Sequence, residues 1–475
     1  MLEIRGKYAV AKIVIDDVEE TALNQIYNIV NNIITKDQEI VVLFDVHAGA
    51  GNAVVGMTMT LGEKITPALC GVDIGCGVLA VCVGENFTTN KDKLLKFEEK
   101  IRNVIPMGNN IQERSAVSSK YFEKNFPWKE ANDLANSFLV SYNKKFGTNF
   151  TGTQFTYKWF LDKQKEIGMK QDAELSIGTL GGGNHFISIE KGVTSNTSWL
   201  IIHCGSRNFG LKVCEHHMKI AKKVLDHKRN VVLRDKISEI KSNFSGEIIP
   251  IKIKEAKKEL GIDFETNTNG MEYLEEQYAM NYFMDMIFSQ KYAQFNRSTI
   301  VDNILKILGE KETDRIESVH NYIDFSDMII RKGAIRSYIG EGIIVPISMA
   351  YGSFLCTGKS NPDYNYSCGH GAGRVKSRGE ASRTIDMKDF EFEMKGIVST
   401  SVVKGCLDEA PQAYKNPKII EAAIEPTATI IERVKPLLNL KDKGETMSWK
   451  ERKAKEKKDK SERLNRRDMR RMRDK

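Results

Sequence analysis

The run from Tyr366 to Arg374, Tyr-Ser-Cys-Gly-His-Gly-Ala-Gly-Arg, sets a histidine among glycines and closes on an arginine. Glycine permits backbone conformations and close approaches that a side chain would block. Such a loop can turn its N–H groups toward an anion and leave the imidazole of His370 bare. A histidine that attacks a phosphate would need this arrangement, with Arg374 to bind the charge. A glycine-rich turn that carries a structural histidine explains the run equally well.

A second glycine-containing run, Val72-Asp-Ile-Gly-Cys-Gly77, places Asp73 and Cys76 three residues apart on a loop that can fold sharply. A carboxylate and a thiolate at this spacing could share a metal ion. The sulfur could also bridge two ions about 4 Å apart, the usual separation in two-metal sites. Taken alone, Cys76 is more often a small buried hydrophobic residue.

Further histidines fall in polar loops. His185 follows Asn184 directly after a triple glycine, His203 precedes Arg207 at the end of an apolar run, and His320 follows a charged stretch. Each alone is more often structural than functional. Together, three imidazoles, one carboxylate and one thiolate predict a two-metal site for Mn²⁺ or Zn²⁺.

The other histidines receive different predictions. His47 is a candidate for support behind the metal ligands. Three more lie in charged helical sequence, so we expect them at the surface: His216, His217 and His227.

The elements that must position these loops can be read from periodicity. Alternation and apolar runs predict strands over residues 8–15, 40–46, 175–189, 198–204 and 331–357. Apolar spacing at three and four residues predicts helices over residues 19–34, through much of 91–170, and over most of 212–309. The pattern indicates an α+β fold, with a β-rich core, functional loops at strand ends and a mainly helical insertion at about 212–309.

Composition limits the class of protein. The chain has 475 residues, 41% of them hydrophobic, which is enough for a large core. No run approaches the roughly 18 apolar residues of a membrane span, and the N-terminus lacks a signal-peptide core. The eight cysteines show no framework spacing, which favours a reducing compartment. We expect a cytoplasmic protein with no membrane partner.

The net charge of +8 is concentrated at one end. Residues 445–475 contain seven Lys and seven Arg against seven Asp or Glu, so this tail carries +7 and residues 1–444 carry +1. The tail contains no proline or glycine and few apolar residues, which is typical of a solvated helix or a disordered segment. It is either an electrostatic arm for nucleic acid or a solubilising end.

The motifs together resemble one family. DVHAGAG, VDIGCG, GTLGGGNHF, HCGSR, HN, RKGA, SCGHGAGR and DEAPQAYK occur in that order between Asp45 and Lys441. This set is similar to the RtcB family of GTP-dependent RNA ligases. The resemblance implies that residues 1–444 form a catalytic domain with an α+β fold particular to that family. It also implies an enzyme that joins an RNA 3′-phosphate or 2′,3′-cyclic phosphate end to a 5′-hydroxyl end, in RNA splicing or repair.

The resemblance also implies roles for residues. Cys76 would bridge two Mn²⁺ ions, with His203 and His320 on one ion and Asp73 and His185 on the other. His370 would attack the α-phosphate of GTP and form a histidine–GMP intermediate, from which GMP passes to the RNA 3′-phosphate. A cyclic phosphate would first be opened by a metal-activated water. Some members of the family use a helper protein that accelerates turnover, and this chain could do the same.

Two binding sets follow from the same resemblance. The first would bind GTP, and its members are Asn184, Phe186, Ser188, His320, Asn321, Pro346, Ser348, Met349, Ser353, His370, Gly371, Ala372, Gly373 and Lys441. The second would bind RNA phosphates or the transferring phosphoryl group, and consists of Arg207 and Arg374.

The chain departs from the family pattern at several positions. Ser188 stands where the family usually has a glutamate, which removes one contact to the nucleotide. Ile347 and Ala350 replace expected glycines, so we expect a bulkier pocket wall. The family normally ends in Lys-Gly close to the position of Lys441, whereas this chain reads Lys441-Asp-Lys-Gly444 and continues into the basic tail.

Two other classes of function compete with the ligase. A metal-dependent cyclic phosphodiesterase that processes RNA ends without ligating them would need the metal ligands but not His370 or its glycine loop. A catalytically silent RNA-binding protein would need the basic tail but no metal ligands. Both the ligands and the loop are present, which favours the ligase.

Overall fold

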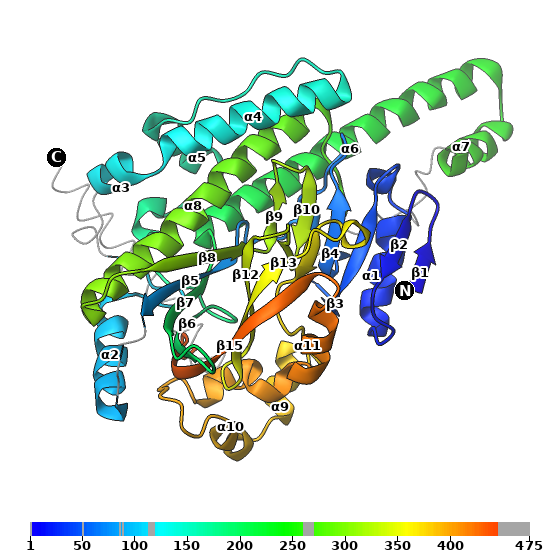
Figure 1. The fold of residues 1–475 in the computed structure, drawn as a ribbon. Coiled ribbons are helices and arrows are strands. Elements are labelled where there is room, and N and C mark those ends of the chain that lie inside the picture. Colours follow the sequence, from blue (N-terminus) through cyan, green and yellow to red (C-terminus); the bar gives the residue numbers. More distant parts are fainter. Residues whose placement is uncertain are drawn as a thin grey trace, which may run out of the picture.

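The computed structural model describes residues 2–49, 52–84, 87, 90–112, 119–259 and 270–444. Two β-sheets form the centre of the molecule, and long helices cover one side of them (Figure 1). This arrangement confirms the α+β fold that the sequence predicts. The basic tail, residues 445–475, lies outside the described residues.

The first sheet has six strands in the order β1-β2-β3-β4-β10-β9. Neighbouring strands run antiparallel, except for the parallel pair β2–β3. Its members are β1 (Leu2–Arg5), β2 (Val10–Ile13), β3 (Ile40–His47), β4 (Val55–Thr60), β9 (Asn321–Asp324) and β10 (Ile329–Lys332).

The second sheet has seven strands in the order β12-β13-β15-β6-β7-β5-β8, all antiparallel. Its members are β5 (Gly77–Gly84), β6 (Phe186–Gly192), β7 (Ser198–Cys204), β8 (Asp314–Val319), β12 (Gly342–Ser348), β13 (Gly352–Gly358) and β15 (Ala428–Leu440). A two-stranded sheet pairs β11 (Ala334–Arg336) with β14 (Ser367–Gly369).

Helices surround the sheets, with α4, α6 and α8 extending across one side and α9 to α11 at the opposite end (Figure 1). The α-helices are α1 (Glu20–Val30), α2 (Lys91–Val104), α3 (Ser119–Asn125), α4 (Trp128–Phe146), α5 (Tyr157–Glu166), α6 (Arg207–Asn243), α7 (Ile248–Glu259), α8 (Glu276–Leu308), α9 (Arg378–Thr384), α10 (Met387–Glu393) and α11 (Pro417–Ile424). Short 3-10 helices are η1 (Ile33–Thr35), η3 (Pro67–Leu69), η4 (Ala173–Ser176), η5 (Pro362–Tyr364), η6 (Lys404–Glu409) and η7 (Pro411–Ala413).

Helix α8 is the central helix of the fold. It packs against β5 and β7 on one side and against α4 and α6 on the other. Because neighbours surround it, residues on every face are buried, and they include polar ones such as Asp285, Asn296 and Arg297. Its apolar residues belong to two core clusters, one with β3, β4 and α4 and one with β5, β6 and β7.

Most predicted elements occur close to where the sequence places them. The predicted strand 40–46 is β3, and the helical stretch 212–309 contains most of α6 and the whole of α7 and α8. The strand predicted over 175–189 is wrong in its first half. There the chain forms η4 and then a turn in which Gly178 and Gly183 have positive φ, so an extended strand cannot form.

The prediction that all three helical histidines lie at the surface is wrong for His217. Its side chain is buried, and its Nε2 lies 2.8 Å from a carboxylate oxygen of Asp285 on α8. His227 is exposed as expected, and His216 is half-buried. The face of α6 that carries His217 packs on α8, and local charge density does not reveal which face of a helix meets a neighbour.

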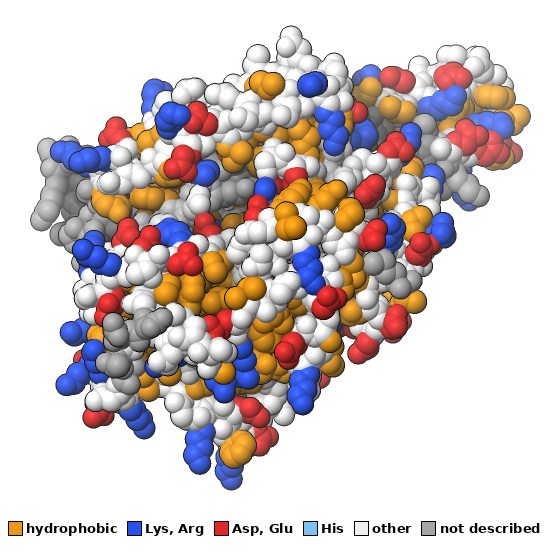
Figure 2. Space-filling model, viewed as in Figure 1, with side chains coloured by type: hydrophobic (Ala, Val, Ile, Leu, Met, Phe, Trp, Pro, Cys, Tyr) orange, Lys and Arg blue, Asp and Glu red, His pale blue; other side chains and the backbone are white. Residues whose placement is uncertain are grey.

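None of the helices in the described ranges is long and apolar enough to cross a bilayer. All eight cysteines are buried and free, as expected for a chain without a disulfide framework. On the face shown in Figure 2, basic and acidic side chains are interspersed rather than segregated.

Candidate active site

The ends of four adjacent strands in the seven-stranded sheet bring four of the candidate metal ligands together. Cys76 directly precedes β5, His185 directly precedes β6, His203 lies in β7 and His320 directly follows β8. Gly77 of β5 pairs with Cys204 of β7 and with Val319 of β8, while Phe186 of β6 pairs with His203. The strand order β6-β7-β5-β8 therefore places residues more than 240 positions apart in sequence side by side.

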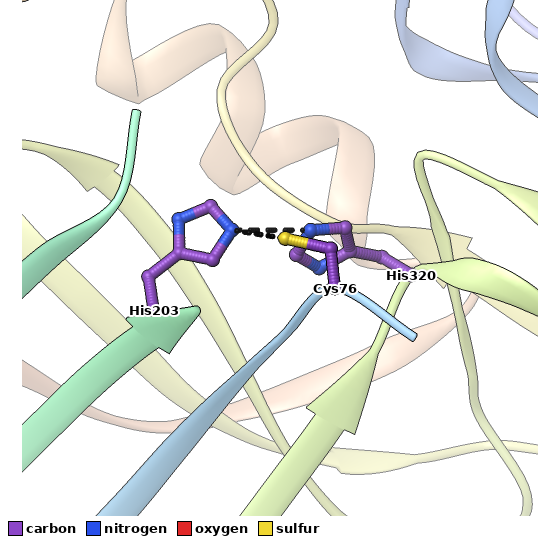
Figure 3. A group of neighbouring side chains, drawn as sticks. All are labelled: Cys76, His203 and His320. Carbon is purple, nitrogen blue, oxygen red and sulfur yellow. Dashed lines mark hydrogen bonds between the residues drawn. The ribbon is translucent and has the colours of Figure 1, made fainter. Parts of the chain in front are cut away.

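The ligand atoms form two overlapping groups, each within 4.8 Å. In the first, the Cys76 sulfur lies 3.3 Å from Nε2 of His203, which lies 3.1 Å from Nε2 of His320 (Figure 3). In the second, the same sulfur lies 3.4 Å from Nε2 of His185, which lies 2.9 Å from Asp73. Cys76 is common to both groups.

The protonation states suit metal binding. His203 donates from Nδ1 to the carbonyl of Asn184 at 3.1 Å, which leaves the Nε2 lone pair free to face the cluster. Burial, followed by the positive charge of neighbouring histidines, holds the pKa of His203 and of His320 well below the usual range. Both therefore remain neutral imidazoles, the form that binds a metal ion.

In the second group, the pKa values of His185 and Cys76 are raised rather than lowered. Burial lowers the pKa of His185, but charge on Cys76 and Cys204 and the hydrogen bond to Asp73 outweigh it, and the pKa stands well above its usual range. Burial, aided by the charge of Asp73, raises the pKa of the Cys76 thiol to about 12. A divalent cation would reverse both effects, because it favours the thiolate and the neutral imidazole. The mixed imidazole, thiolate and carboxylate donors fit Mn²⁺ or Zn²⁺.

Two buried residues of α8 hold the loops that carry the ligands. Arg297 donates from Nη1 to the carbonyls of Gly75 at 2.7 Å and Cys204 at 2.8 Å, and pairs with Glu317. Asn296 accepts from the N–H of Gly178 at 2.8 Å and donates to the carbonyl of Gly205 at 3.3 Å. Sequence reasoning missed both residues, because in the sequence they are two polar positions of one long helix.

His370 directly follows β14 and faces a carboxylate on β3. Its Nδ1 lies 2.6 Å from Oδ2 of Asp45 and 2.8 Å from the carbonyl of Gly333. Both neighbours are acceptors, so Nδ1 carries the proton and Nε2 carries the free lone pair. The ring centre lies 4.5 Å from that of His320, next to the metal ligands.

The glycine before His370 is required by packing. A Cβ at Gly369 would meet the ring of Phe44 on β3. The close approach of the His370 loop to β3 that this glycine allows brings the backbone N–H of His370 to 2.9 Å from Asp45. The loop is therefore fixed by the buried carboxylate at both its backbone and its side chain.

A cavity of about 630 Å³ opens beside His370. Its wall includes eleven of the residues expected to bind GTP, namely Asn184, Phe186, Pro346, Ser348, Met349, Ser353, His370, Gly371, Ala372, Gly373 and Lys441. Ile347 also lines it, at a position where the sequence predicts a bulkier wall. The volume is in the range of small-molecule sites.

Three other residues of the expected nucleotide set do not line this cavity as the described residues define it. Ser188 is buried, and its hydroxyl donates to the carbonyl of Leu438 at 3.0 Å. The amide oxygen of Asn321 accepts from the N–H of Gly333 at 3.1 Å. His320 lies among the candidate metal ligands.

Cationic residues of the cavity converge on a single buried carboxylate. Glu409 lies 3.0 Å from Nζ of Lys441 and 3.4 Å from Nη1 of Arg374, and it also contacts Arg378. Burial opposes its ionisation, but Lys441 and Arg378 outweigh burial and lower the pKa of Glu409 to about 2. The charged cluster is a local excess of positive charge, suited to an anionic ligand.

The remaining candidates lie near the site. Arg207, at the start of α6, donates from Nε to the hydroxyl of Thr179 at 3.1 Å, beside the glycine turn that precedes His185. His47 lines the cavity, and its Nδ1 lies 2.9 Å from the carbonyl of Asp45. Burial, the largest influence, lowers the pKa of His47.

Sequence reasoning missed further residues that line the cavity or lie behind it. Asp45 and Glu409 lie within quoted motifs, but nothing local shows that they contact His370 and Lys441. Glu190 and Asn439 lie on β6 and β15 and also line the cavity. The alternation of β6, in which position 190 shares a face with position 188, is the signal that could have found Glu190.

Comparison with known proteins identifies a family. The family model described as tRNA-splicing ligase RtcB matches residues 25–442. The chain is 25% identical to the RNA-splicing ligase RtcB of Escherichia coli K12 over 421 residues, covering 85% of this chain and 90% of that protein. It is 24% identical to the tRNA-splicing ligase RtcB of Archaeoglobus fulgidus over 428 residues, covering 79% of this chain and 81% of the relative. The matched segment contains every candidate metal ligand, His370 and most of the residues that line the cavity, and the chain belongs to the RtcB family.

Proposed function

We propose that this chain is an RNA ligase that uses GTP and Mn²⁺ to join an RNA 3′-phosphate or 2′,3′-cyclic phosphate end to a 5′-hydroxyl end, in RNA splicing or repair. Membership of the RtcB family and the names of its relatives support RNA ligation. The observation that carries the chemistry is His370, whose Nε2 lone pair is left free by Asp45 beside the metal ligands and the cavity.

The first step is nucleotidyl transfer to the protein. Nε2 of His370 attacks the α-phosphorus of GTP, the bond to the bridging oxygen of the β-phosphate breaks, and pyrophosphate leaves. Asp45 and the carbonyl of Gly333 accept hydrogen bonds from the Nδ1 proton and stabilise the positive charge that develops on the ring. Arg374, Arg378 and Lys441 supply positive charge for the triphosphate.

The second and third steps transfer GMP onward. An oxygen of the RNA 3′-phosphate attacks the same phosphorus, the P–N bond breaks, and its electron pair returns to Nε2. The 5′-hydroxyl oxygen then attacks the RNA 3′-phosphorus, GMP leaves, and a phosphodiester results. A cyclic phosphate end requires prior hydrolysis to the 3′-phosphate.

The two ligand groups built on Cys76 would hold the metal ions. Bound there, divalent cations neutralise phosphate charge and act as Lewis acids. Neutral His203 and His320 would supply nitrogen ligands to one ion, and Asp73 would supply an anionic oxygen to the other. Arg297 and Asn296 keep the loops in register, so the donors do not need to reorganise on binding.

The test is a covalent adduct. The protein is incubated with Mn²⁺ and GTP labelled at the α-phosphate, and the expected product is an acid-labile protein–GMP adduct that transfers its label to RNA ending in a 3′-phosphate. His370→Ala should abolish the adduct. The matched control is His227→Ala, an exposed histidine of α6 that should label as the wild type does.

Two outcomes would overturn the proposal in different ways. An adduct that persists in His370→Ala would eliminate this nucleophile. A wild-type protein that forms no adduct but still opens cyclic phosphates would identify a metal-dependent phosphodiesterase instead.

A further inference from the structure

Among the described residues, one wall of the cavity carries three buried polar atoms that complete no hydrogen bond of good geometry, although the Ser353 hydroxyl lies close enough to Glu190 to influence its carboxylate. They are Oε2 of Glu190, Oγ of Ser353 and Oδ1 of Asn439, and all three residues line the cavity. Their exposed fractions are 2%, 0% and 3%. Buried polar groups are normally paired, so three orphans on one cavity wall indicate a polar ligand that satisfies them.

The three residues come from adjacent strands. β15 lies between β13, which carries Ser353, and β6, which carries Glu190. A Cβ at Gly352 would lie 3.1 Å from Oε2 of Glu190, so the carboxylate reaches across toward the start of β13. Each of the three residues lies in an internal strand of the sheet. The positions of these polar groups are therefore fixed by the fold.

The strand alternation explains why the carboxylate stands at position 190. Side chains two residues apart point to the same face of a strand, so Ser188 and Glu190 share a face of β6. The hydroxyl of Ser188 is already bonded to the carbonyl of Leu438. Position 188 lacks a carboxylate, but Glu190 supplies one on the same face of β6, two residues further along.

A carboxylate at this wall discriminates among nucleobases. It accepts hydrogen bonds only, so it matches a base edge that presents two adjacent donors. Guanine presents N1–H and its 2-amino group side by side. Adenine presents an acceptor at N1. Uracil has carbonyl oxygens on both sides of N3–H, and cytosine has acceptors at N3 and O2. Each of these bases would therefore place a lone pair against the carboxylate.

We propose that Glu190 selects the base of the nucleotide, accepting hydrogen bonds from N1–H and the 2-amino group of guanine. The proposal rests on the GTP dependence proposed above and adds the residue that determines it. Ser353 and Asn439 supply further polar contacts on the same wall.

The electrostatics of the wall agree with this role. Burial raises the pKa of Glu190 to about 7, while the hydroxyls of Ser188 and Ser353 and the charge of Arg433 oppose the rise. A base that brings two donors would favour the ionised carboxylate. Binding of guanine would therefore satisfy a group that the protein alone leaves costly to ionise.

The experiment changes the hydrogen-bonding groups of the nucleotide base and of residue 190. Adduct formation in Mn²⁺ is measured for wild type and Glu190→Gln with α-labelled GTP, ITP, XTP and ATP. Wild type should prefer GTP over ITP, which lacks the 2-amino group, by roughly tenfold or more, because ITP cannot make the second hydrogen bond to the charged acceptor. Glu190→Gln should lose GTP use by a similar factor and gain XTP use. The amide oxygen can accept from N1–H of xanthine while the amide N–H donates to its 2-oxo group.

The controls are a substitution at an exposed glutamate and the nucleotide preference of the wild type. Glu421→Gln, at an exposed glutamate of α11, should retain the wild-type order of nucleotides. Equal use of GTP and ITP, or of GTP and ATP, by wild type would overturn the inference even if Glu190→Gln fails to fold. So would a folded Glu190→Gln with an unchanged ratio of GTP to XTP. A wild type that labels with no nucleotide would overturn the proposed function itself, which separates the two failures.

Discussion

At the scale of single residues, the decisive contact is the one between Asp45 and His370. Asp45 is fully buried on β3, and its Oδ2 holds both the backbone N–H and Nδ1 of His370. The arrangement resembles the acid that orients the histidine of a catalytic triad, where the carboxylate fixes the tautomer and stabilises the charged ring. The structure thereby assigns the free lone pair to Nε2.

Asp45→Asn should slow formation of the GMP adduct by roughly 10²- to 10⁴-fold, because an amide can donate to Nδ1 and stabilise the wrong tautomer. GTP affinity, measured by equilibrium binding, should change much less. The control is Asp363→Asn, an exposed aspartate of η5. Equal losses in affinity and in single-turnover rate would instead indicate a general collapse of the pocket.

The raised pKa of Glu190 predicts a pH-dependent stability. The ordinary pKa is 4.5 and that in the folded protein is about 7, so between these values the folded state holds a proton that the unfolded state has released. Glu190 should therefore contribute a loss of stability as pH rises from about 4.5 to 7, by about 3 kcal/mol. Ser188, Ser353 and Arg433 are the groups that limit this loss.

Thermal melting without nucleotide checks this prediction. The melting temperature of Glu190→Gln minus that of wild type should grow across the same pH interval and then level off. A difference that stays constant from about pH 4.5 to 7 would show that Glu190 is ionised in the empty cavity at all these values.

At the scale of elements, the candidate metal centre is formed where the ends of β6, β7, β5 and β8 lie side by side. Asn296 and Arg297 of α8 tie the backbone of these ends, from Gly178 to Gly205 and from Gly75 to Cys204. Gly205, directly after β7, lies against the carboxylate of Asp73, and a Cβ there would collide with it. The absence of a side chain at this strand end is therefore part of the metal centre.

Gly205→Ala should displace Asp73 and weaken Mn²⁺ binding by about 10- to 100-fold, the range seen when support behind a ligand is disturbed. Titration calorimetry with Mn²⁺ measures the affinity. Gly379→Ala, on α9, is the matched control, since its new methyl group would meet only the end of the Arg383 side chain. Unchanged affinity in Gly205→Ala would exclude Asp73 as a ligand.

At the scale of the whole molecule, charge is unevenly divided between the body and the tail. The tail carries +7 of the net +8, and the face of the body in Figure 2 mixes both signs. The family match ends at residue 442, before this segment. A basic arm of this kind would add affinity for RNA without sequence preference, through release of counterions from phosphates.

Deletion of residues 445–475 should leave the GMP adduct unchanged and reduce the salt dependence of RNA binding. The slope of log affinity against log salt should become shallower by about 0.7 for each phosphate of single-stranded RNA that the tail neutralises. A second variant replaces Arg466, Arg467, Arg470 and Arg471 by Gln and should give part of the effect. If the slope is the same for the full chain and the deletion, the tail is a solubilising end.

The sequence alone determined the chemistry that is available. Asp73, Cys76, His185, His203, His320 and His370 stand out because each is a potential metal ligand or nucleophile in a short run with Gly, Asn or Arg close by in the sequence. Such runs also identify β3, β7 and the helical region that contains α8, since burial on both sides of a strand leaves a local pattern of apolar residues. The motifs that carry these residues were enough to identify the family.

Only the tertiary structure decided which side chains meet. Glu190, Asn296, Arg297 and His217 look in sequence like ordinary positions of a strand or a helix. Their roles arise because β6 lies beside β15, and because α8 packs on both the sheet and α6. The order of strands and the packed faces of helices are set by contacts between distant segments, which leave no local periodicity. For that reason the sequence identified His370, whereas the fold determined which of its nitrogens is free.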